Sequence, residues 1–300
     1  MRILTTTSDF GEHDIPDEIE LIRNPYGRML SEKEISKILD EIRPDAIIAG
    51  LEPLTQNVLE GKPYLKVISR CGTGLDNVDL DAAKRLGITV FNTPDAPMAA
   101  VAEMTVALML SLIKRINIYD EVIRRGEWKS PRGNMLSGKT VGIVGCGRIG
   151  EYVSRLLTPF GCDIIGYDIG RIPAGHIKPV EFDFLIKSAD IISLHVPYNE
   201  SNRHIIGVAE INKMKKNALL INTARGGLID EAALYDALSL GTISGAAIDC
   251  FEKEPYDGPL KELSNVILSP HMASSAEESR QGMEKEALEN ALSGLSVPTS

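Results

Sequence analysis

The sequence is poor in cysteine, and its four cysteines show none of the spacings by which cysteines usually bind a metal. Each lies within or beside an apolar or glycine-rich segment, which is typical of a buried thiol; the four are Cys71, Cys146, Cys162 and Cys250. Buried thiols without a disulfide framework are typical of a reducing compartment. We therefore expect a cytoplasmic protein with no metal site.

A long hydrophobic run is also missing. The longest apolar stretch extends from Ala99 to Ile113, is interrupted by Glu103, and falls short of the roughly 20 residues that span a bilayer. At the start of the chain, Met1-Arg2-Ile3-Leu4 runs directly into Thr-Thr-Thr-Ser, unlike a secretory signal. We therefore expect no signal peptide and no membrane partner, and we expect residues 99–113 to form a buried helix between domains or in a dimer.

The chain has no excess of positive charge. It contains 32 Lys and Arg against 42 Asp and Glu, which gives a formal net charge of −10. This balance argues against nucleic acid and against an anionic membrane surface as partners. An anionic substrate would have to be attracted by a local group of arginines and backbone N–H groups, because the overall field of the protein opposes it.

Size and patterning predict two α/β domains. A chain of 300 residues with 43% hydrophobic residues exceeds the size at which one core usually suffices. Strand and helix patterns alternate throughout, which implies parallel sheets covered on both faces. The expected strands are residues 2–4, 46–49, 65–69, 89–91, 140–144, 163–167, 191–195, 218–222, 245–248 and 266–268. The expected helices are residues 31–43, 57–61, 79–86 and one long helix over about 98–121.

Local signals predict where these elements and domains end. Ser31 and Glu34 have the spacing of a capping box at the first helix. Two prolines indicate a hinge in the segment Asn92–Pro97, since neither fits inside a helix or a central strand. A last helix from about Ser275 should return to the first domain. We expect a boundary near Pro94, with a substrate-binding domain of residues 1–94 plus 275–300 and a dinucleotide-binding domain of residues 95–274.

A glycine-rich motif, G-C-G-R-I-G, lies directly after one of the expected strands. Its glycines, Gly145, Gly147 and Gly150, follow the buried-strand pattern at 140–144 and open a helical stretch. This is the context of a dinucleotide-binding turn: the first glycine permits a tight turn, the second lets the backbone approach a pyrophosphate, and the third lets helix and strand pack closely. The helix N-terminus would then face the anion.

The next expected strand, residues 163–167, ends directly before Asp168. This is close to the spacing of the carboxylate that binds the adenosine ribose hydroxyls in dinucleotide-binding domains. The negative charge of Asp168 would repel a 2′-phosphate, so we predict NAD rather than NADP as the cofactor. Arg171 is the one residue nearby that could weaken this preference. The alternative is that Asp168 merely begins a turn before Gly170.

Three residues further along the chain have the chemistry needed for keto-acid reduction. Arg225 lies in N-T-A-R-G-G, Glu254 in F-E-K-E-P and His271 in S-P-H-M-A-S. A guanidinium can hold a carboxylate and stabilise growing negative charge, while a carboxylate orients an imidazole that donates a proton as hydride arrives. Each residue alone could instead be an exposed ion-pair partner or a structural residue. Their order downstream of the dinucleotide motif favours catalysis.

A second glycine-rich turn, R-C-G-T-G, lies in the first part of the chain. Backbone N–H groups in Cys71, Gly72, Thr73 and Gly74 could form an anion nest for a substrate carboxylate. The same glycines could instead meet a need for positive φ, and both interpretations can hold at once. Arg70 could reach a second, distal anion of the substrate, or it could pair with an acidic residue of its own domain.

These motifs together resemble the NAD-dependent D-2-hydroxyacid dehydrogenases, most closely the branch that contains D-3-phosphoglycerate dehydrogenase. The resemblance extends from about Ala46 to Gly282 and rests on R-C-G-T-G-L-D-N-V-D, L-S-G-K-T-V-G-I-V-G-C-G-R-I-G, H-V-P, N-T-A-R-G-G-L-I-D-E, A-I-D-C-F-E-K-E-P and S-P-H. It implies two flavodoxin-like or Rossmann-like domains with cofactor and active site in the cleft between them, and a homodimer built around the segment after the hinge. It also implies interconversion of a D-2-hydroxy acid and its 2-oxo acid, with D-3-phosphoglycerate or another substrate bearing a second anion as candidates.

The resemblance assigns roles to individual residues. It implies that Arg225, Glu254 and His271 are catalytic. Besides the glycines of the fingerprint, it implies NAD contacts for Thr73, Arg148, Ile149, Asp168, Val196, Pro197, Thr223 and Asp249. Asp249 is expected to hold the nicotinamide amide. The small anionic substrate is expected to contact Arg70, Cys71, Gly72, Thr73, Gly74, Arg225 and His271.

The chain departs from the family pattern at several positions. Ala273 stands where the family usually has glycine, and its methyl group could crowd the nicotinamide. Tyr198-Asn199 follows H-V-P where Leu-Thr is usual, and Gly50-Leu51-Glu52 lacks the arginine that some phosphoglycerate-specific relatives place in this loop. Because the sequence ends near residue 300, we expect no regulatory domains and no serine feedback.

A different class of function stays open at this point. Corepressor relatives of the family use the same scaffold to sense NAD(H), and active-site residues can persist in them. An exposed partner groove or a long disordered tail would favour that alternative, and the sequence shows neither. Formate dehydrogenase, a third possibility, is disfavoured because that branch carries an amide where Glu254 stands.

Overall fold

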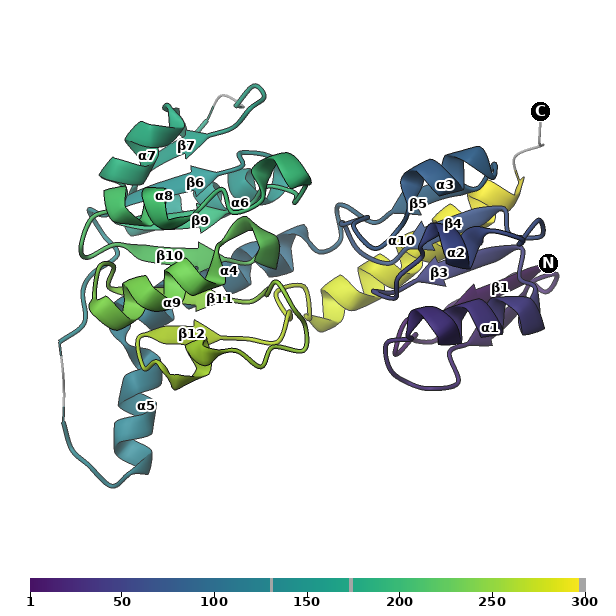
Figure 1. The fold of residues 1–300 in the computed structure, drawn as a ribbon, viewed down its shortest axis with the longest axis horizontal. Coiled ribbons are helices and arrows are strands. Elements are labelled where there is room, and N and C mark those ends of the chain that lie inside the picture. The colour runs from purple at the N-terminus through teal and green to yellow at the C-terminus, as the bar shows by residue number, and fades with distance from the viewer. Residues whose placement is uncertain (130–131, 173–174, 297–300) are drawn as a thin grey trace. The chain divides into compact units, whose positions relative to one another are not determined.

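A computed structural model describes residues 1–129, 132–172 and 175–296 of the chain (Figure 1). The chain divides into two compact units. Unit 1 consists of Met1–Pro97 and Ala276–Ser300, and unit 2 of Met98–Ser275. Each unit contains one sheet in which all neighbouring strands are parallel. Every helix among the described residues is too short or too polar to cross a membrane.

The sheet of unit 1 has five strands in the order β2-β1-β3-β4-β5, which is the flavodoxin-like order. The strands are β1 (Arg2–Thr5), β2 (Glu20–Arg23), β3 (Ala46–Ala49), β4 (Val67–Arg70) and β5 (Thr89–Asn92). Four of them were predicted. The edge strand β2 was missed because a charged residue stands at each end of its four residues, so it lacks the continuous apolar pattern of a central strand.

Helices cover both faces of this sheet. They are α1 (Glu32–Ile42), α2 (Gln56–Leu59), α3 (Leu80–Arg85) and α10 (Glu277–Ser296). Leu4, Ile47 and Ile68 pack with α1, α2 and α3 on one face, while Ile3, Ile48 and Val67 pack with α10 on the other. The side chains of Ser31 and Glu34 form the predicted capping box at the start of α1.

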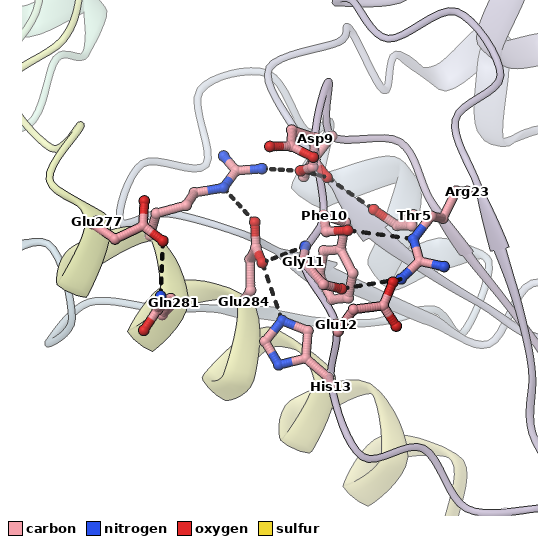
Figure 2. Close-up of polar contacts among 12 residues, drawn as sticks. Thr5, Asp9, Phe10, Gly11, Glu12, His13, Arg23, Glu277, Gln281 and Glu284 are labelled. Carbon is pink, nitrogen blue, oxygen red and sulfur yellow. Dashed lines mark hydrogen bonds and ion pairs between the residues drawn. The ribbon is translucent and has the colours of Figure 1, made fainter.

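Helix α10 is also tied to the N-terminal loop of unit 1 by a buried carboxylate (Figure 2). Glu284 is 3% exposed and accepts hydrogen bonds from the Gly11 N–H at 2.8 Å, from His13 Nε2 at 3.0 Å, and from Arg280 Nε. Burial raises the pKa of Glu284, but these donors outweigh it and hold the pKa below its ordinary value. The tie therefore joins residues more than 270 positions apart.

The sheet of unit 2 has seven strands in the order β12-β11-β10-β9-β6-β7-β8. The strands are β6 (Thr140–Val144), β7 (Asp163–Tyr167), β8 (Lys178–Pro179), β9 (Ile191–Leu194), β10 (Leu219–Asn222), β11 (Gly245–Ile248) and β12 (Val266–Leu268). The strand order reverses between β6 and β9, as in a Rossmann sheet with one added edge strand. The six predicted strands are confirmed. The seventh, β8, is two residues long and contains a proline, which leaves no pattern to detect.

The helices of unit 2, apart from α5, lie on both faces of its sheet. They are α4 (Met98–Lys114), α5 (Ile116–Arg124), α6 (Arg148–Leu157), α7 (Phe182–Ser188), α8 (Val208–Lys213) and α9 (Glu231–Leu240), with short 3₁₀ turns η1 (Thr158–Phe160), η2 (Glu200–Asn202), η3 (Gly226–Leu228) and η4 (Pro259–Glu262). Helices α4 and α6 pack on one face, and α7, α8 and α9 on the other. The predicted single helix over 98–121 is wrong, because Arg115 adopts a left-handed conformation at φ 58° and separates α4 from α5.

Candidate active site

The glycine-rich turn joins β6 to α6 at the point where the strand order reverses. Gly145 N–H donates to the Tyr167 carbonyl at 2.9 Å, and an added Cβ at Gly150 would lie 2.1 Å from the Gly145 oxygen, so only glycine fits there. An added Cβ at Gly147 would meet no atom within 4 Å. The turn therefore packs tightly against the protein at Gly150 but leaves open space at Gly147. This space lies next to the first N–H groups of α6, where a pyrophosphate would bind.

Asp168 follows β7 and is bonded to this turn. Its Oδ2 accepts from the Cys146 N–H at 2.7 Å, and its Oδ1 accepts from the Gly170 N–H at 2.8 Å. A carboxylate offers about four acceptor positions, so these two bonds fix its orientation and leave capacity for ribose hydroxyls. The bond to Gly170 also means that Asp168 begins a turn, so both interpretations of this residue are compatible.

Other candidate cofactor residues follow strands of the same sheet. Arg148 and Ile149 begin α6, and the rest come after β9, β10 and β11; these are Val196, Pro197, Thr223 and Asp249. The carboxyl ends of parallel strands share one edge, where open α/β sheets bind their ligands. Thr223 is buried and hydrogen-bonded to Thr105 of α4 at 2.8 Å, and the Pro197 carbonyl accepts from Asn202 at 2.7 Å.

The three candidate catalytic residues follow three adjacent strands. Arg225 comes after β10, Glu254 after β11 and His271 after β12. His271 Nδ1 lies 2.9 Å from Glu254 Oε2 and 3.1 Å from Oε1, and both side chains are about one-third exposed. The structure thus brings together an imidazole and a carboxylate that are 17 residues apart in the chain.

Electrostatics favour an ionised Glu254. Burial raises its pKa, but hydrogen bonds from His271 and the Phe251 N–H, together with the positive charges of His271 and Arg225, outweigh burial and hold the pKa below its ordinary value. An ionised carboxylate only accepts hydrogen bonds, so the proton lies on His271 Nδ1. This leaves Nε2 as the ring nitrogen able to exchange a proton with a substrate.

The loop that carries His271 is wrapped around a buried carboxyl group. Asp249 is fully buried; its Oδ1 accepts from Ser269 Oγ at 2.6 Å and the Met272 N–H at 2.9 Å, and its Oδ2 accepts from the Ala273 N–H at 2.9 Å. The His271 N–H donates to the Asp249 carbonyl at 2.8 Å. These bonds hold His271 at a positive φ of 51°, which is uncommon for a residue with a side chain. The predicted nicotinamide contact of Asp249 would have to be made alongside these bonds.

The loop that carries Arg225 is fixed by a residue that sequence reasoning missed. Asn222 is almost fully buried; its Nδ2 donates to the Arg225 carbonyl at 2.8 Å, and its Oδ1 accepts from the Ala224 N–H at 3.1 Å. An added Cβ at Gly226 would lie 1.9 Å from the Phe251 carbonyl carbon. The glycine therefore lets the Arg225 loop contact the loop that leads to Glu254. The N-T-A-R-G-G motif contains both Asn222 and Gly226, but their spacing in the sequence does not reveal which groups they contact.

The second glycine-rich turn lies in unit 1, after β4. The Cys71 N–H donates to the Ala49 carbonyl at 2.9 Å, and the Gly72 N–H donates to Thr93 Oγ1 at 2.7 Å. These two N–H groups are therefore engaged within the unit. Of the four residues predicted to form the anion nest, only Thr73 and Gly74 are still candidates for binding an anion through their N–H groups.

Arg70 points into unit 1 beneath this turn. It is 8% exposed, and its Nη1 donates to the Cys71 carbonyl at 2.6 Å. An added Cβ at Gly72 would lie only 1.3 Å from that Nη1. The positive charge of Arg70 also acts on Glu52, a buried carboxyl group of the same unit. This placement favours the role of a residue that supports its own loop over that of an exposed anchor for a distal anion.

Known proteins resemble this chain in sequence and fold. A family model described as D-isomer specific 2-hydroxyacid dehydrogenase, NAD binding domain, matches residues 106–273. The chain is 47% identical over 237 residues to D-3-phosphoglycerate dehydrogenase of Methanocaldococcus jannaschii, covering 76% of this chain and 45% of that protein. It is 39% identical over 282 residues to glyoxylate reductase of Thermococcus litoralis, covering 89% of this chain and 84% of that protein. A solved glyoxylate reductase from Paecilomyes thermophila has a TM-score of 0.87 at 31% identity, covering 98% of this chain and 95% of that one.

We expect Asp168→Ala to narrow the preference for NADH over NADPH. The substitution removes charge-assisted hydrogen bonds, worth roughly 1.5–3 kcal/mol, and relieves repulsion of a 2′-phosphate, so the ratio of the two dissociation constants should fall by at least about 10-fold. Fluorescence titration with both cofactors measures it. Asp163→Ala, at the opposite, exposed end of β7, should leave the ratio unchanged. Equal binding of NADH and NADPH by the unmodified protein would contradict the assignment.

Proposed function

The chain belongs to the D-isomer specific 2-hydroxyacid dehydrogenase family, and from this premise we propose that it reduces a 2-oxo acid to the D-2-hydroxy acid and catalyses the reverse oxidation. The observation that carries the proposal is the 2.9 Å contact between His271 Nδ1 and Glu254 Oε2, beside the strand end that bears Arg225. NAD(H), when bound, supplies or accepts the hydride.

Each of the three residues has a distinct task in the proposed reaction. Arg225 holds the substrate carboxylate, polarises the keto group and stabilises the negative charge that grows on its oxygen. His271 donates the proton from Nε2 to that oxygen, and in the oxidative direction neutral His271 accepts a proton there. Glu254 accepts the Nδ1–H bond and thereby keeps the ring in the orientation that presents Nε2.

The glycine-rich turn and the residues around it would hold the cofactor. The open space at Gly147 and the N-terminal residues of α6, Arg148 and Ile149, support a pyrophosphate site. Asp168 is proposed to accept hydrogen bonds from the ribose. Thr73 and Gly74 are proposed to bind an anionic group through their N–H groups, since the overall charge of −10 gives no general attraction for an anion.

The position of Arg70 bears on the substrate. Because its side chain lies beneath Gly72 and bonds to its own loop, we propose that the substrate is a small 2-oxo acid such as glyoxylate or hydroxypyruvate, without a distal phosphate. The 47% identity to a phosphoglycerate dehydrogenase favours a second candidate, the 3-phosphorylated substrate. The chain spans less than half of that relative, 45% of its length.

A matched pair of substrates separates the two candidates. We expect kcat/KM with NADH to be at least as high for hydroxypyruvate as for 3-phosphohydroxypyruvate, because an anchoring Arg–phosphate bond is worth roughly 10- to 100-fold and Arg70 is engaged elsewhere. Initial rates of NADH oxidation measure both values. A preference of more than about 10-fold for the phosphorylated substrate would restore Arg70 as its anchor.

The proton donor is tested by replacing its ring. His271→Asn should lower kcat for the best 2-oxo acid by about two to four orders of magnitude, since general acid–base catalysis contributes roughly 10²- to 10⁴-fold, while the dissociation constant of NADH stays nearly unchanged. Single-turnover rates show whether chemistry is the step that slows.

His204→Asn is the matched control. His204 also has a positive φ, of 52°, and also pairs with a carboxylate, Glu252 at 3.1 Å, in the same unit. Replacing His204 should leave kcat within about 3-fold of the value for the unmodified protein, because His204 has no part in the proposed proton transfer. Near-normal turnover by His271→Asn would contradict the assignment of His271 as the general acid–base. NADH binding without turnover of any 2-oxo acid by the unmodified protein would favour the NAD-sensing alternative.

We also propose that the protein is a cytoplasmic homodimer that pairs through α5. None of the residues of α5 is buried, and Ile116 and Ile123, seven positions apart on one face, are 52% and 54% exposed. Trp128, just after the helix, is 93% exposed. An apolar helix face of this kind is typical of an interface. The four free cysteines support a reducing compartment.

A charge placed on this face should separate the subunits. Ile123→Asp puts a carboxylate into the proposed interface and should shift the solution mass from twice 32.7 kDa to a single chain, as measured by light scattering on a sizing column. Leu240→Asp is the control, because Leu240 is 82% exposed on α9 and should leave the mass unchanged. A monomeric unmodified protein at micromolar concentration would rule out the pairing.

A further inference from the structure

A cysteine thiol lies beside the Glu254–His271 pair. Cys250 Sγ, a carboxylate oxygen of Glu254 and a ring nitrogen of His271 all lie within 4.8 Å of one another. Cys250 follows β11 by two positions and is 1% exposed, and its Sγ is 3.5 Å from the Ala224 carbonyl. Cysteine spacing gave no sign of this cluster, because the other two ligands are not cysteines and His271 reaches Cys250 from the end of a different strand, β12.

The three side chains are a donor set for a thiophilic divalent cation. Zinc binds cysteine sulfur at about 2.3 Å and histidine nitrogen or carboxylate oxygen at about 2.0 Å, so tetrahedral ligands lie about 3.3–3.5 Å apart. Starting from separations of up to 4.8 Å, the thiol would have to approach the other two ligands by up to about 1.4 Å, while the 2.9 Å contact between His271 and Glu254 would widen slightly; rotation of Cys250 and Glu254 about their side-chain bonds can provide both movements. Sulfur, imidazole and carboxylate together favour zinc or cobalt over magnesium or calcium.

The geometry points to a new metal site: we propose that Cys250, Glu254 and His271 bind one zinc ion through Sγ, a carboxylate oxygen and Nδ1, and that the bound ion switches off the dehydrogenase. The ion enters from the side of His271 and Glu254, whose side chains are 29% and 34% exposed, and reaches the buried sulfur last. The fourth coordination position is left for water, as in other zinc sites with three protein ligands.

Inhibition follows from where the ion sits. Zinc binds the thiolate of Cys250 and the neutral ring of His271 at Nδ1; the thiol proton passes to solvent, and the Nδ1 proton moves to Nε2, so the ring stays neutral. Glu254 then binds the metal instead of orienting the ring, and His271 Nε2 no longer belongs to an imidazole paired with a carboxylate. The inhibitory half of this inference rests on the proposed function, whereas metal binding itself does not.

Metal binding is tested without any enzyme assay. Protein stripped with a chelator is titrated with Co²⁺, whose thiolate-to-metal absorption reports a bound sulfur, and with Zn²⁺ in equilibrium dialysis. We expect one ion per chain for the unmodified protein and for Cys162→Val, which removes another partly buried thiol. Cys250→Val should abolish the thiolate band and weaken Zn²⁺ binding by more than about 100-fold, because losing even a group that only hydrogen-bonds a ligand costs about 10- to 100-fold.

His271→Asn supplies a second test of the same site, since it keeps the thiol but removes the nitrogen ligand. It should also weaken Zn²⁺ binding by more than about 100-fold. Unchanged stoichiometry and affinity in Cys250→Val, or a thiolate band that survives His271→Asn at full strength, would overturn the site.

Activity then tests the inhibitory role. Zn²⁺ should inhibit NADH oxidation by the unmodified protein and by Cys162→Val, with the inhibition constant at least about 100-fold higher for Cys250→Val. Equal inhibition of Cys250→Val would show that the ion acts elsewhere. If no 2-oxo acid is reduced while the cobalt band depends on Cys250, the metal site stands and the proposed dehydrogenase activity fails.

Discussion

The loop of unit 2 that carries His271 depends on the hydrogen bonds accepted by the carboxyl group of Asp249. A polar group buried to this extent is costly unless its acceptors are satisfied, and the donors come from Ser269, Met272 and Ala273, which flank His271 on both sides. The backbone must therefore close around Asp249, and His271 at the centre of that loop has little freedom. The positive φ of His271 thus results from the backbone closing around Asp249. In this conformation the His271 ring contacts Glu254.

The parallel sheet adds the second constraint. Parallel strands end at a common edge, so residues after β10, β11 and β12 become neighbours whatever their separation in the chain. Asn222 and Gly226 convert this general closeness into a defined contact between the loops of Arg225 and Glu254. The same edge places Cys250 two residues beyond β11. One architectural rule therefore accounts for the Glu254–His271 pair, for the guanidinium of Arg225 after the neighbouring strand and for the thiol of Cys250 beside the pair.

Much of the fold could be predicted because its signals are local, whereas the pairing of Glu254 with His271 was expected from the chemistry of a carboxylate and an imidazole. The G-C-G-R-I-G turn is marked by a change from strand pattern to helix pattern, and the capping box of α1 spans four residues. The break at Arg115 was not predictable, since helical patterns continue on both sides of it. The direction of the Arg70 side chain could not be predicted for another reason. Its guanidinium occupies the space that a side chain at position 72 would fill, and it can do so only because that residue is glycine.

Unit 1 is built from both ends of the chain, and this affects how the protein can fold as it is synthesised. Ile3, Ile48 and Val67 lie on the sheet face that α10 covers, and Glu284 of α10 accepts hydrogen bonds from Gly11 and His13. Unit 2 has all of its residues before α10 emerges from the ribosome, so it can finish first. The N-terminal sheet must wait without the helix that covers much of one apolar face, and it is the part of a nascent chain that most needs protection from aggregation.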